Sequence, residues 1–152
     1  MKKVEYEELN TLYQQLINKA IAVRENASAN YSKFKVGAAL LDENGNIHCG
    51  INVETADYTL TTHAEMLAVD NMIMSGAREI KAIAIALSSN DEYAVPCGLC
   101  RQKMSEFSQP ECDIICVNLN SEYKIKTIYI TNLEQLLPFP FMKSALQLSY
   151  FR

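Results

Sequence analysis

The chemistry of this chain is first suggested by two cysteines three positions apart. Cys97 and Cys100 lie in the segment "PCGLC", where Cys97 directly follows a proline. Such a pair can be a disulfide, a redox pair, part of a metal site or two small core residues. The chain has five cysteines, an odd number, which disfavours a disulfide framework. A thioredoxin-like redox pair follows the first strand of its fold, whereas this pair follows a later strand.

A histidine and a glutamate complete the pattern. His63 and Glu65 begin a predicted helix in "TTHAEMLAV", where each alone is explained as an ordinary helix-start residue. His-x-Glu at one helix start and Pro-Cys-x-x-Cys at another are together typical of zinc-dependent deaminases. The pattern predicts His63, Cys97 and Cys100 as ligands of one Zn²⁺, with the fourth position left to water. Glu65, close to the metal without binding it, is the predicted proton carrier.

The remaining candidates near this pattern have simpler explanations. His48 alternates with apolar residues inside a predicted strand and is expected to be a surface or hydrogen-bonded residue. Arg101 follows Cys100 and either donates to a thiolate or is a solvated helix charge. The other cysteines, Cys49, Cys112 and Cys116, are expected to pack as small apolar residues. A purely structural zinc site would need a fourth protein ligand, for which Cys49 is the available residue.

The elements that must position these residues follow from periodicity and turn signals. The pattern alternates helices and strands without repeats or linkers, which predicts one α/β domain over residues 1–152. Four residues, "NSEY", join the last two strands, and a parallel crossover needs a dozen or more, so these strands should pair antiparallel. The predicted helices are 4–25, 61–76, about ten residues after Pro96, and one or two within 133–150; the predicted strands are 36–52 as a hairpin, 81–87, 112–119 and 123–130.

Composition and charge exclude several classes of function. The net charge is −4 and no basic stretch is visible, which disfavours nucleic acid as a partner. The longest apolar run, 82–87, is far too short to span a bilayer, so no membrane partner is expected. The chain opens "MKKVEYEELN", without the apolar stretch of a signal peptide, and we expect a cytoplasmic protein.

Four ordered motifs resemble those of the cytidine deaminase family. "KFKVGAA" is similar to the family's Phe-x-Val-Gly-Ala-Ala, and "NVETA" to its Asn-Val-Glu-Asn segment. "THAE" with "PCGLCRQ" resembles its metal motifs, and "LLPFPF" resembles its C-terminal Leu-Leu-Pro-x-x-Phe. The resemblance implies a three-layer α/β/α sandwich around a five-stranded mixed sheet with an antiparallel last strand pair. It also implies a homotetramer with shared active sites.

The resemblance also implies a substrate site. Phe34 would pack on a pyrimidine ring, Asn52 and Glu54 would bind the ribose 3′-hydroxyl, and Ala64 would present its N–H to the base. Ala56, Tyr58 and Phe141 would reach the pocket of a neighbouring subunit. A carboxylate at Glu54 accepts from a hydroxyl but repels a phosphate, which favours a free nucleoside. Two departures from the family's pattern are Thr55, where a second Asn is usual, and His63, where most short members have cysteine.

The implied activity is hydrolytic deamination of cytidine and deoxycytidine with release of ammonia, with one Zn²⁺ per subunit. Glu65 would protonate ring N3 and then the leaving amino group. Because of Thr55, deamination of blasticidin-S-like or N4-modified cytosine nucleosides stays open as an alternative activity. The non-enzymatic alternative is a zinc-stabilised binding module. A deaminase of the tRNA-editing type needs a helix between the last two strands, which the short connection excludes.

Overall fold

A mixed six-stranded sheet forms the centre of the protein. The computed structural model describes residues 1–141. The strand order is β1-β6-β5-β4-β2-β3, and β4 and β5 are the one parallel pair of that sheet within these residues. The strands are β1 (Lys2–Val4), β2 (Gly37–Asp42), β3 (Ile47–Ile51), β4 (Ile80–Leu87), β5 (Ser108–Leu119) and β6 (Ile125–Asn132). The predicted mixed sheet is confirmed, but the expected count of five strands was wrong by one.

The additional strand is β1, at the edge of the sheet. Val4 is buried and pairs with Ile128 of β6, while the two lysines before it are exposed. The sequence pattern placed residues 4–25 in one helix, because a strand with a single inward-facing apolar residue leaves almost no alternation to detect. Helix α1 (Thr11–Arg24) instead begins after Asn10, whose side chain accepts a hydrogen bond from the Tyr13 amide at 2.8 Å.

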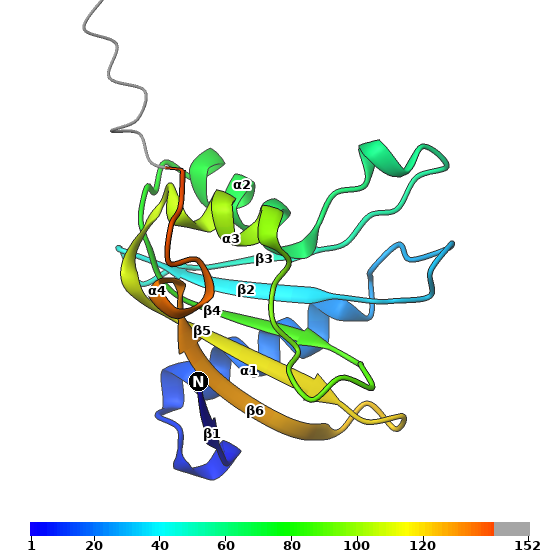
Figure 1. The fold of residues 1–152 in the computed structure, drawn as a ribbon, viewed down its shortest axis with the longest axis horizontal. Coiled ribbons are helices and arrows are strands. Elements are labelled where there is room, and N and C mark those ends of the chain that lie inside the picture. The colour runs from blue at the N-terminus through cyan, green and yellow to red at the C-terminus, as the bar shows by residue number, and fades with distance from the viewer. Residues whose placement is uncertain (142–152) are drawn as a thin grey trace, which may run out of the picture.

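Helices cover both faces of the sheet, as Figure 1 shows. Helix α1 lies on one face, and α2 (Ala64–Met74) with α3 (Gly98–Ser105) lies on the other. Strand β4 shows how the sequence specifies both layers: Ile83 and Ile85 pack on the α2 side, and the small residues 82, 84 and 86 pack on the α1 side. This alternation follows from the two-residue period of a strand buried on both faces.

Two glycines allow the helices to approach the sheet closely. A Cβ added at Gly50 of β3 would lie 2.1 Å from the carbonyl oxygen of Ala64, at the start of α2. At Gly37 of β2 it would lie 2.2 Å from the carbonyl oxygen of Ala20 in α1. Any larger residue must push the helix away, because the contacted atoms belong to the backbone. Gly50 therefore fixes the height of the α2 start above the sheet.

The β5–β6 connection is a short turn, and the two strands pair antiparallel, as predicted. Asn120 holds this turn, because its side chain accepts hydrogen bonds from the amides of Glu122 and Lys124. A four-residue helix, α4 (Leu133–Leu136), follows β6 and accounts for the first of the helices expected within 133–150. The remainder of that prediction lies in part outside residues 1–141. Within that range, none of the helices combines the length and the apolar character that a membrane crossing requires.

Candidate active site

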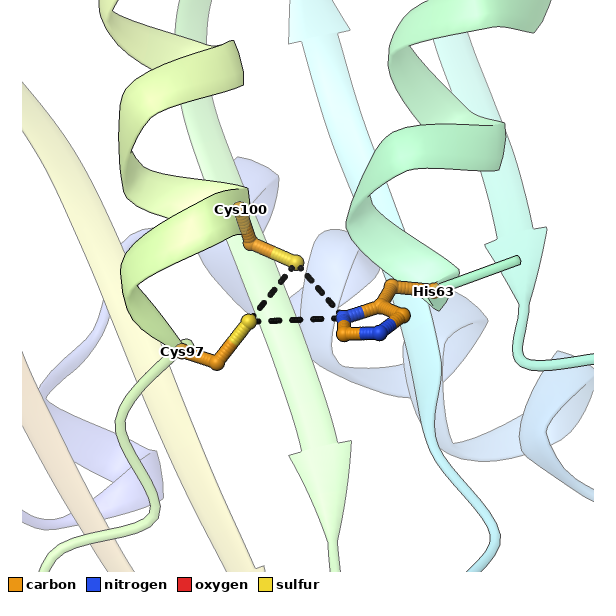
Figure 2. A group of neighbouring side chains, drawn as sticks. All are labelled: His63, Cys97 and Cys100. Atoms are coloured by element: carbon orange, nitrogen blue, oxygen red, sulfur yellow. Dashed lines mark hydrogen bonds between the residues drawn. The ribbon is translucent and has the colours of Figure 1, made fainter. Parts of the chain in front are cut away.

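The three predicted metal ligands come together at the starts of two helices. His63 precedes the first residue of α2, Cys97 precedes the first residue of α3, and Cys100 lies in the first turn of α3. Their side chains converge from the two helices in Figure 2. His63 Nδ1 lies 3.3 Å from the Sγ atoms of both cysteines, and the two sulfurs are 3.5 Å apart. Within residues 1–141, this is the one group of His, Cys, Asp or Glu residues with the proximity that a metal ion requires.

The donor set fits zinc. Tetrahedral nitrogen and sulfur ligands at about 2.0–2.3 Å from Zn²⁺ are themselves about 3.5–3.8 Å apart, close to the separations seen here. Burial raises the pKa of the Cys100 thiol far above its usual range, and the nearby Glu65 and Cys97 raise it further. A buried thiolate therefore needs a compensating cation, although the helix N-terminus also favours it. Three ligands leave a fourth position, which is the arrangement of a catalytic rather than a structural zinc site.

Glu65 lies in the first turn of α2, beside the ligand group. Its side chain is buried, with a residue exposure of 5%. Burial raises the pKa of its carboxyl, partly opposed by hydrogen bonding to the backbone and by Cys100 and His63. A raised pKa makes the carboxyl a better proton acceptor than an ordinary glutamate, which suits a group that takes up and passes on a proton.

An open cavity of about 330 Å³ leads to this group. Seven of the residues predicted from the sequence line the cavity, and they come from four segments of the chain. The lining residues are Phe34, Val36, Asn52, Glu54, Thr61, His63, Ala64, Glu65, Leu87, Ser89, Asp91, Tyr93, Ala94, Val95 and Cys97. Cys100 completes the metal group without lining the cavity.

Three predicted substrate residues lie away from this cavity. Ala56 and Tyr58 are exposed on the segment between β3 and α2, and Phe141 is exposed after α4. Gln102 of α3 holds the Phe141 backbone with two hydrogen bonds, 2.8 Å to its carbonyl and 3.0 Å from its amide. The resemblance assigned these three residues to a neighbouring subunit's pocket, and all three are exposed.

The residues on the predicted sugar side are tied to the backbone of a neighbouring loop. The Asn52 side chain accepts from the Val36 amide and donates to the Phe34 carbonyl, both at 2.8 Å. The Glu54 carboxylate accepts from the amides of Tyr31 and Ser32 and from the Ser32 hydroxyl. Hydrogen bonds from Ser32 lower the pKa of Glu54, so it is a carboxylate at neutral pH. These two residues hold the 31–36 loop and, with it, the Phe34 ring.

Arg101 acts on the backbone around the metal group. Its guanidinium donates to the carbonyl oxygens of Pro96 at 2.7 Å and Leu136 at 2.9 Å. It therefore links the residue before Cys97 to the end of α4. Both of these hydrogen bonds go to backbone carbonyls and not to a cysteine sulfur. A link of this kind orients the ligand-bearing turn.

The other cysteines and the second histidine lie outside the site. Cys112 and Cys116 are buried on β5, where burial raises the pKa of each thiol to about 12, and Cys49 is half-buried on β3. His48 forms a 2.8 Å hydrogen bond with the buried carboxylate of Asp42. The expectations for all four residues are confirmed. Cys49 does not belong to the ligand group, so the structural four-ligand alternative has no support.

One wall of the cavity was not predicted from the sequence. Ser89, Asp91 and Tyr93 line it, and all three follow the carboxyl end of β4. The available signal was their position between a buried strand and "PCGLC", because segments after parallel strands commonly carry binding residues. Nothing in the residue types themselves indicated that they face the cavity.

The layered fold and a three-ligand metal group beside a buried acid define a zinc-dependent hydrolytic protein of the α/β class. The family model for the cytidine and deoxycytidylate deaminase zinc-binding region matches residues 10–116. This range includes both ligand-bearing segments and more than half of the chain. The chain therefore belongs to the cytidine and deoxycytidylate deaminase family.

Individual proteins agree with this assignment. A cytidine deaminase of Sporosarcina psychrophila is 37% identical over 133 residues, which cover 88% of this chain and 93% of that protein. One of Halalkalibacterium halodurans is 38% identical over 115 residues, covering 76% and 86%. The crystal structure of cytidine deaminase from Burkholderia pseudomallei superposes with a TM-score of 0.76 at 37% identity, covering 85% of this chain and 98% of that one.

Proposed function

We propose that the protein hydrolyses cytidine and deoxycytidine to uridine and deoxyuridine and releases ammonia. The observation that carries this proposal is the buried Glu65 carboxyl beside the His63, Cys97 and Cys100 group, at the base of a cavity whose volume of about 330 Å³ suits a small molecule. Relatives named cytidine deaminase that span most of the chain support the same reaction.

The reaction requires two proton transfers, which we assign to Glu65. When bound, Zn²⁺ supplies the Lewis acidity that makes water nucleophilic near neutral pH. Glu65 takes one proton from the attacking water and delivers it to ring N3. It then carries the second proton from the new C4 hydroxyl to the amino group, and the C4–N bond breaks. The water oxygen stays on C4 and the nitrogen leaves as ammonia, so atoms and protons balance. The raised pKa of the buried carboxyl suits both transfers.

Substrate binding is assigned to the cavity walls. The Phe34 ring would pack on the pyrimidine, Asn52 and Glu54 would contact the ribose, and the Ala64 amide, at the first turn of α2, would bind the base. Thr55 does not line the cavity, and its hydroxyl donates to the Asp57 carbonyl at 2.5 Å. That contact gives no support to a changed sugar pocket, so the unsubstituted nucleosides are the proposed substrates.

We further propose a homotetramer in which Ala56, Tyr58 and Phe141 contribute to neighbouring active sites. Tyr58 is 72% exposed and Phe141 59% exposed, so both rings are open to contact from another subunit. Sedimentation tests this arrangement: a fully active monomer would contradict shared pockets. The thiolate ligands suit a reducing compartment, and we place the reaction in the cytoplasm.

Ultraviolet absorbance of purified protein with cytidine tests the reaction, with deoxycytidine and N4-substituted cytidines in parallel. We expect the spectrum to change to that of uridine and ammonia to accumulate in equal amount. Glu65→Gln separates an enzyme from a zinc-stabilised binding module: we expect turnover to fall by about 10²–10⁴-fold while metal and fold are retained. An unfolded variant, with a parent inactive on every cytosine compound, would favour the module.

A further inference from the structure

Asp91 is the cavity-lining carboxylate whose role the proposed reaction does not explain. It lies on the wall formed by residues 89–95, after β4. The other carboxylate of the outer cavity, Glu54, accepts hydrogen bonds from Tyr31 and Ser32, and the nearby Lys33 partly offsets its charge. Within residues 1–141, no donor is hydrogen-bonded to the Asp91 carboxylate, and no Lys or Arg lines the cavity. Asp91 therefore brings uncompensated negative charge to the cavity.

A buried side chain holds this wall in place. Asn118, at the carboxyl end of β5, is 1% exposed and pairs in register with Leu87 of β4. Its Oδ1 accepts from the Ser89 amide at 2.9 Å, and its Nδ2 donates to the carbonyls of Ser89 at 3.1 Å and Asp91 at 3.0 Å. The Asp91 amide also donates to the Ser89 hydroxyl at 3.0 Å. All these bonds hold the backbone, so the Asp91 side chain stays free for the cavity.

The far end of the wall is held from β6. The Tyr129 hydroxyl donates to the Glu92 carboxylate at 3.1 Å, and the rings of Tyr93 and Tyr129 stand edge to face with centroids 5.1 Å apart. The segment is thus fastened on both sides of Asp91. Asp91 itself is exposed at the open cavity, and the fastened backbone keeps its charge at a constant position relative to a bound ligand.

We propose that Asp91 is a specificity-determining residue that disfavours phosphorylated substrates, and that Asn118 positions it. The proposal rests on the deamination of cytosine nucleosides by this site. A phosphate carries about two negative charges at neutral pH, and no cation of the cavity wall offsets its approach to Asp91. A hydroxyl or an ammonium group at the same position can instead donate to the carboxylate.

The experiment compares three substrates that differ only at the ribose 5′ carbon: cytidine, cytidine 5′-monophosphate and 5′-amino-5′-deoxycytidine. We expect Asp91→Asn to raise kcat/KM for the monophosphate relative to cytidine by about tenfold and to lower that for the amino compound by several-fold. A rise in relative kcat/KM for the anionic monophosphate together with a fall for the cationic amino compound cannot result from a general loss of structure. Both changes should shrink at high salt, because ions screen the charge.

Glu92→Gln is the matched control. It removes the same charge one residue away, the Glu92 side chain does not line the cavity, and the amide oxygen of glutamine can still accept from the Tyr129 hydroxyl. We expect its substrate ratios to match those of the unaltered protein. Equal ratios in Asp91→Asn and the unaltered protein, or equal shifts in Asp91→Asn and Glu92→Gln, would overturn the assignment of Asp91.

Asn118→Ala tests the positioning role, with Val117→Ala as a control buried on the same strand but in the core on the α1 side. We expect Asn118→Ala to shift the substrate ratios in the direction of Asp91→Asn and to speed amide exchange at Ser89. Val117→Ala should do neither, although it also lowers stability. Unchanged ratios and exchange in Asn118→Ala would overturn the positioning role.

The proposed deamination and the proposed role of Asp91 can be tested separately. If the unaltered, zinc-loaded protein does not convert cytidine, the proposed function is contradicted, whatever Asp91 does. Calorimetric binding of cytidine and cytidine 5′-monophosphate to the same variants then decides on Asp91: a binding ratio unaffected by Asp91→Asn overturns its role, and a ratio shifted toward the monophosphate supports it.

Discussion

The metal group and the outer cavity are built in contrasting ways. His63, Glu65, Cys97 and Cys100 come from two short segments at helix starts, and both helices rest on buried strands of the sheet. The outer cavity is assembled from the 31–36 loop, residues 52–54 and the 89–95 wall. Asn52 holds the loop, and Asn118 of β5 holds the wall, in both cases through side-chain hydrogen bonds to backbone.

The contrast shows where local sequence is sufficient to specify chemistry. Two motifs of three and four residues place four functional groups, because a helix start fixes the direction of its first side chains. Selectivity depends instead on contacts between segments far apart in the chain, such as Asn118 with Ser89. Changes in the first region should therefore affect metal and turnover, and changes in the second should affect substrate binding with the metal retained.

The largest effect is expected from loss of a ligand. Cys100→Ser should lower zinc affinity by more than about 100-fold, because even outer contacts to metal ligands are worth 10–100-fold, and deamination should fall with it. Metal analysis after dialysis measures the loss. Cys112→Ser is the matched control, since Cys112 is also buried but lies outside the ligand group, and it should keep its zinc. Equal zinc content in the two variants would contradict the ligand assignment.

A change at Asn52 tests the outer cavity. Asn52→Ala removes both 2.8 Å hydrogen bonds to the 34–36 backbone and should raise KM for cytidine by about 10–100-fold, because each buried bond lost costs about 1–3 kcal/mol. Steady-state kinetics with parallel zinc analysis gives the result. A fall in kcat together with zinc, at constant KM, would place Asn52 with the metal region and remove the contrast.

Gly50 links the scaffold to the metal group. Gly50→Ala should lower the free energy of unfolding by about 1–3 kcal/mol, because the added Cβ meets the Ala64 carbonyl at the start of α2. The displaced helix start should also weaken zinc binding. Gly98→Ala is the control, since nothing lies within 4 Å of a Cβ there, and denaturant unfolding should show it equal to or more stable than the parent. Similar losses in both would contradict the close-approach account.

The smallest effect on chemistry is expected at Asp42, where β2 ends. Burial raises the pKa of this carboxyl, but hydrogen bonds from His48, Asn46 and Asn44 outweigh it and bring the pKa to about 2. Because the pKa is lower in the folded state, the charged carboxylate stabilises the fold above the unfolded pKa of about 4. This stabilisation is lost as the pH falls through about 2. Asp42→Asn should therefore lower stability by about 1–3 kcal/mol at pH 7 and flatten its decline between pH 4 and 2.

Unfolding followed by circular dichroism across this pH range measures the Asp42 effect. KM for cytidine and zinc content should match the parent, because Asp42 does not line the cavity. A variant with unchanged stability, or with a steeper decline in acid, would contradict the hydrogen-bond account of the lowered pKa.

The layers and the metal group could be predicted from sequence because their signals are local. The pattern of residues 81–87 predicts a buried strand, and the two ligand motifs predict helix starts. Strand β1 could not be predicted, because only Val4 faces inward. The Asp42–His48 pair depends on hairpin register, and the Asn118–Ser89 contacts depend on the pairing of β4 with β5. Neither register is encoded in the residue types of a single segment.

Zinc content and cytidine turnover, measured on one sample through removal and return of the metal, test the central claim most directly. We predict one zinc per chain, conversion of cytidine to uridine, loss of both on chelation and recovery of both when zinc is added. Protein that converts cytidine at full rate without bound metal would contradict the account.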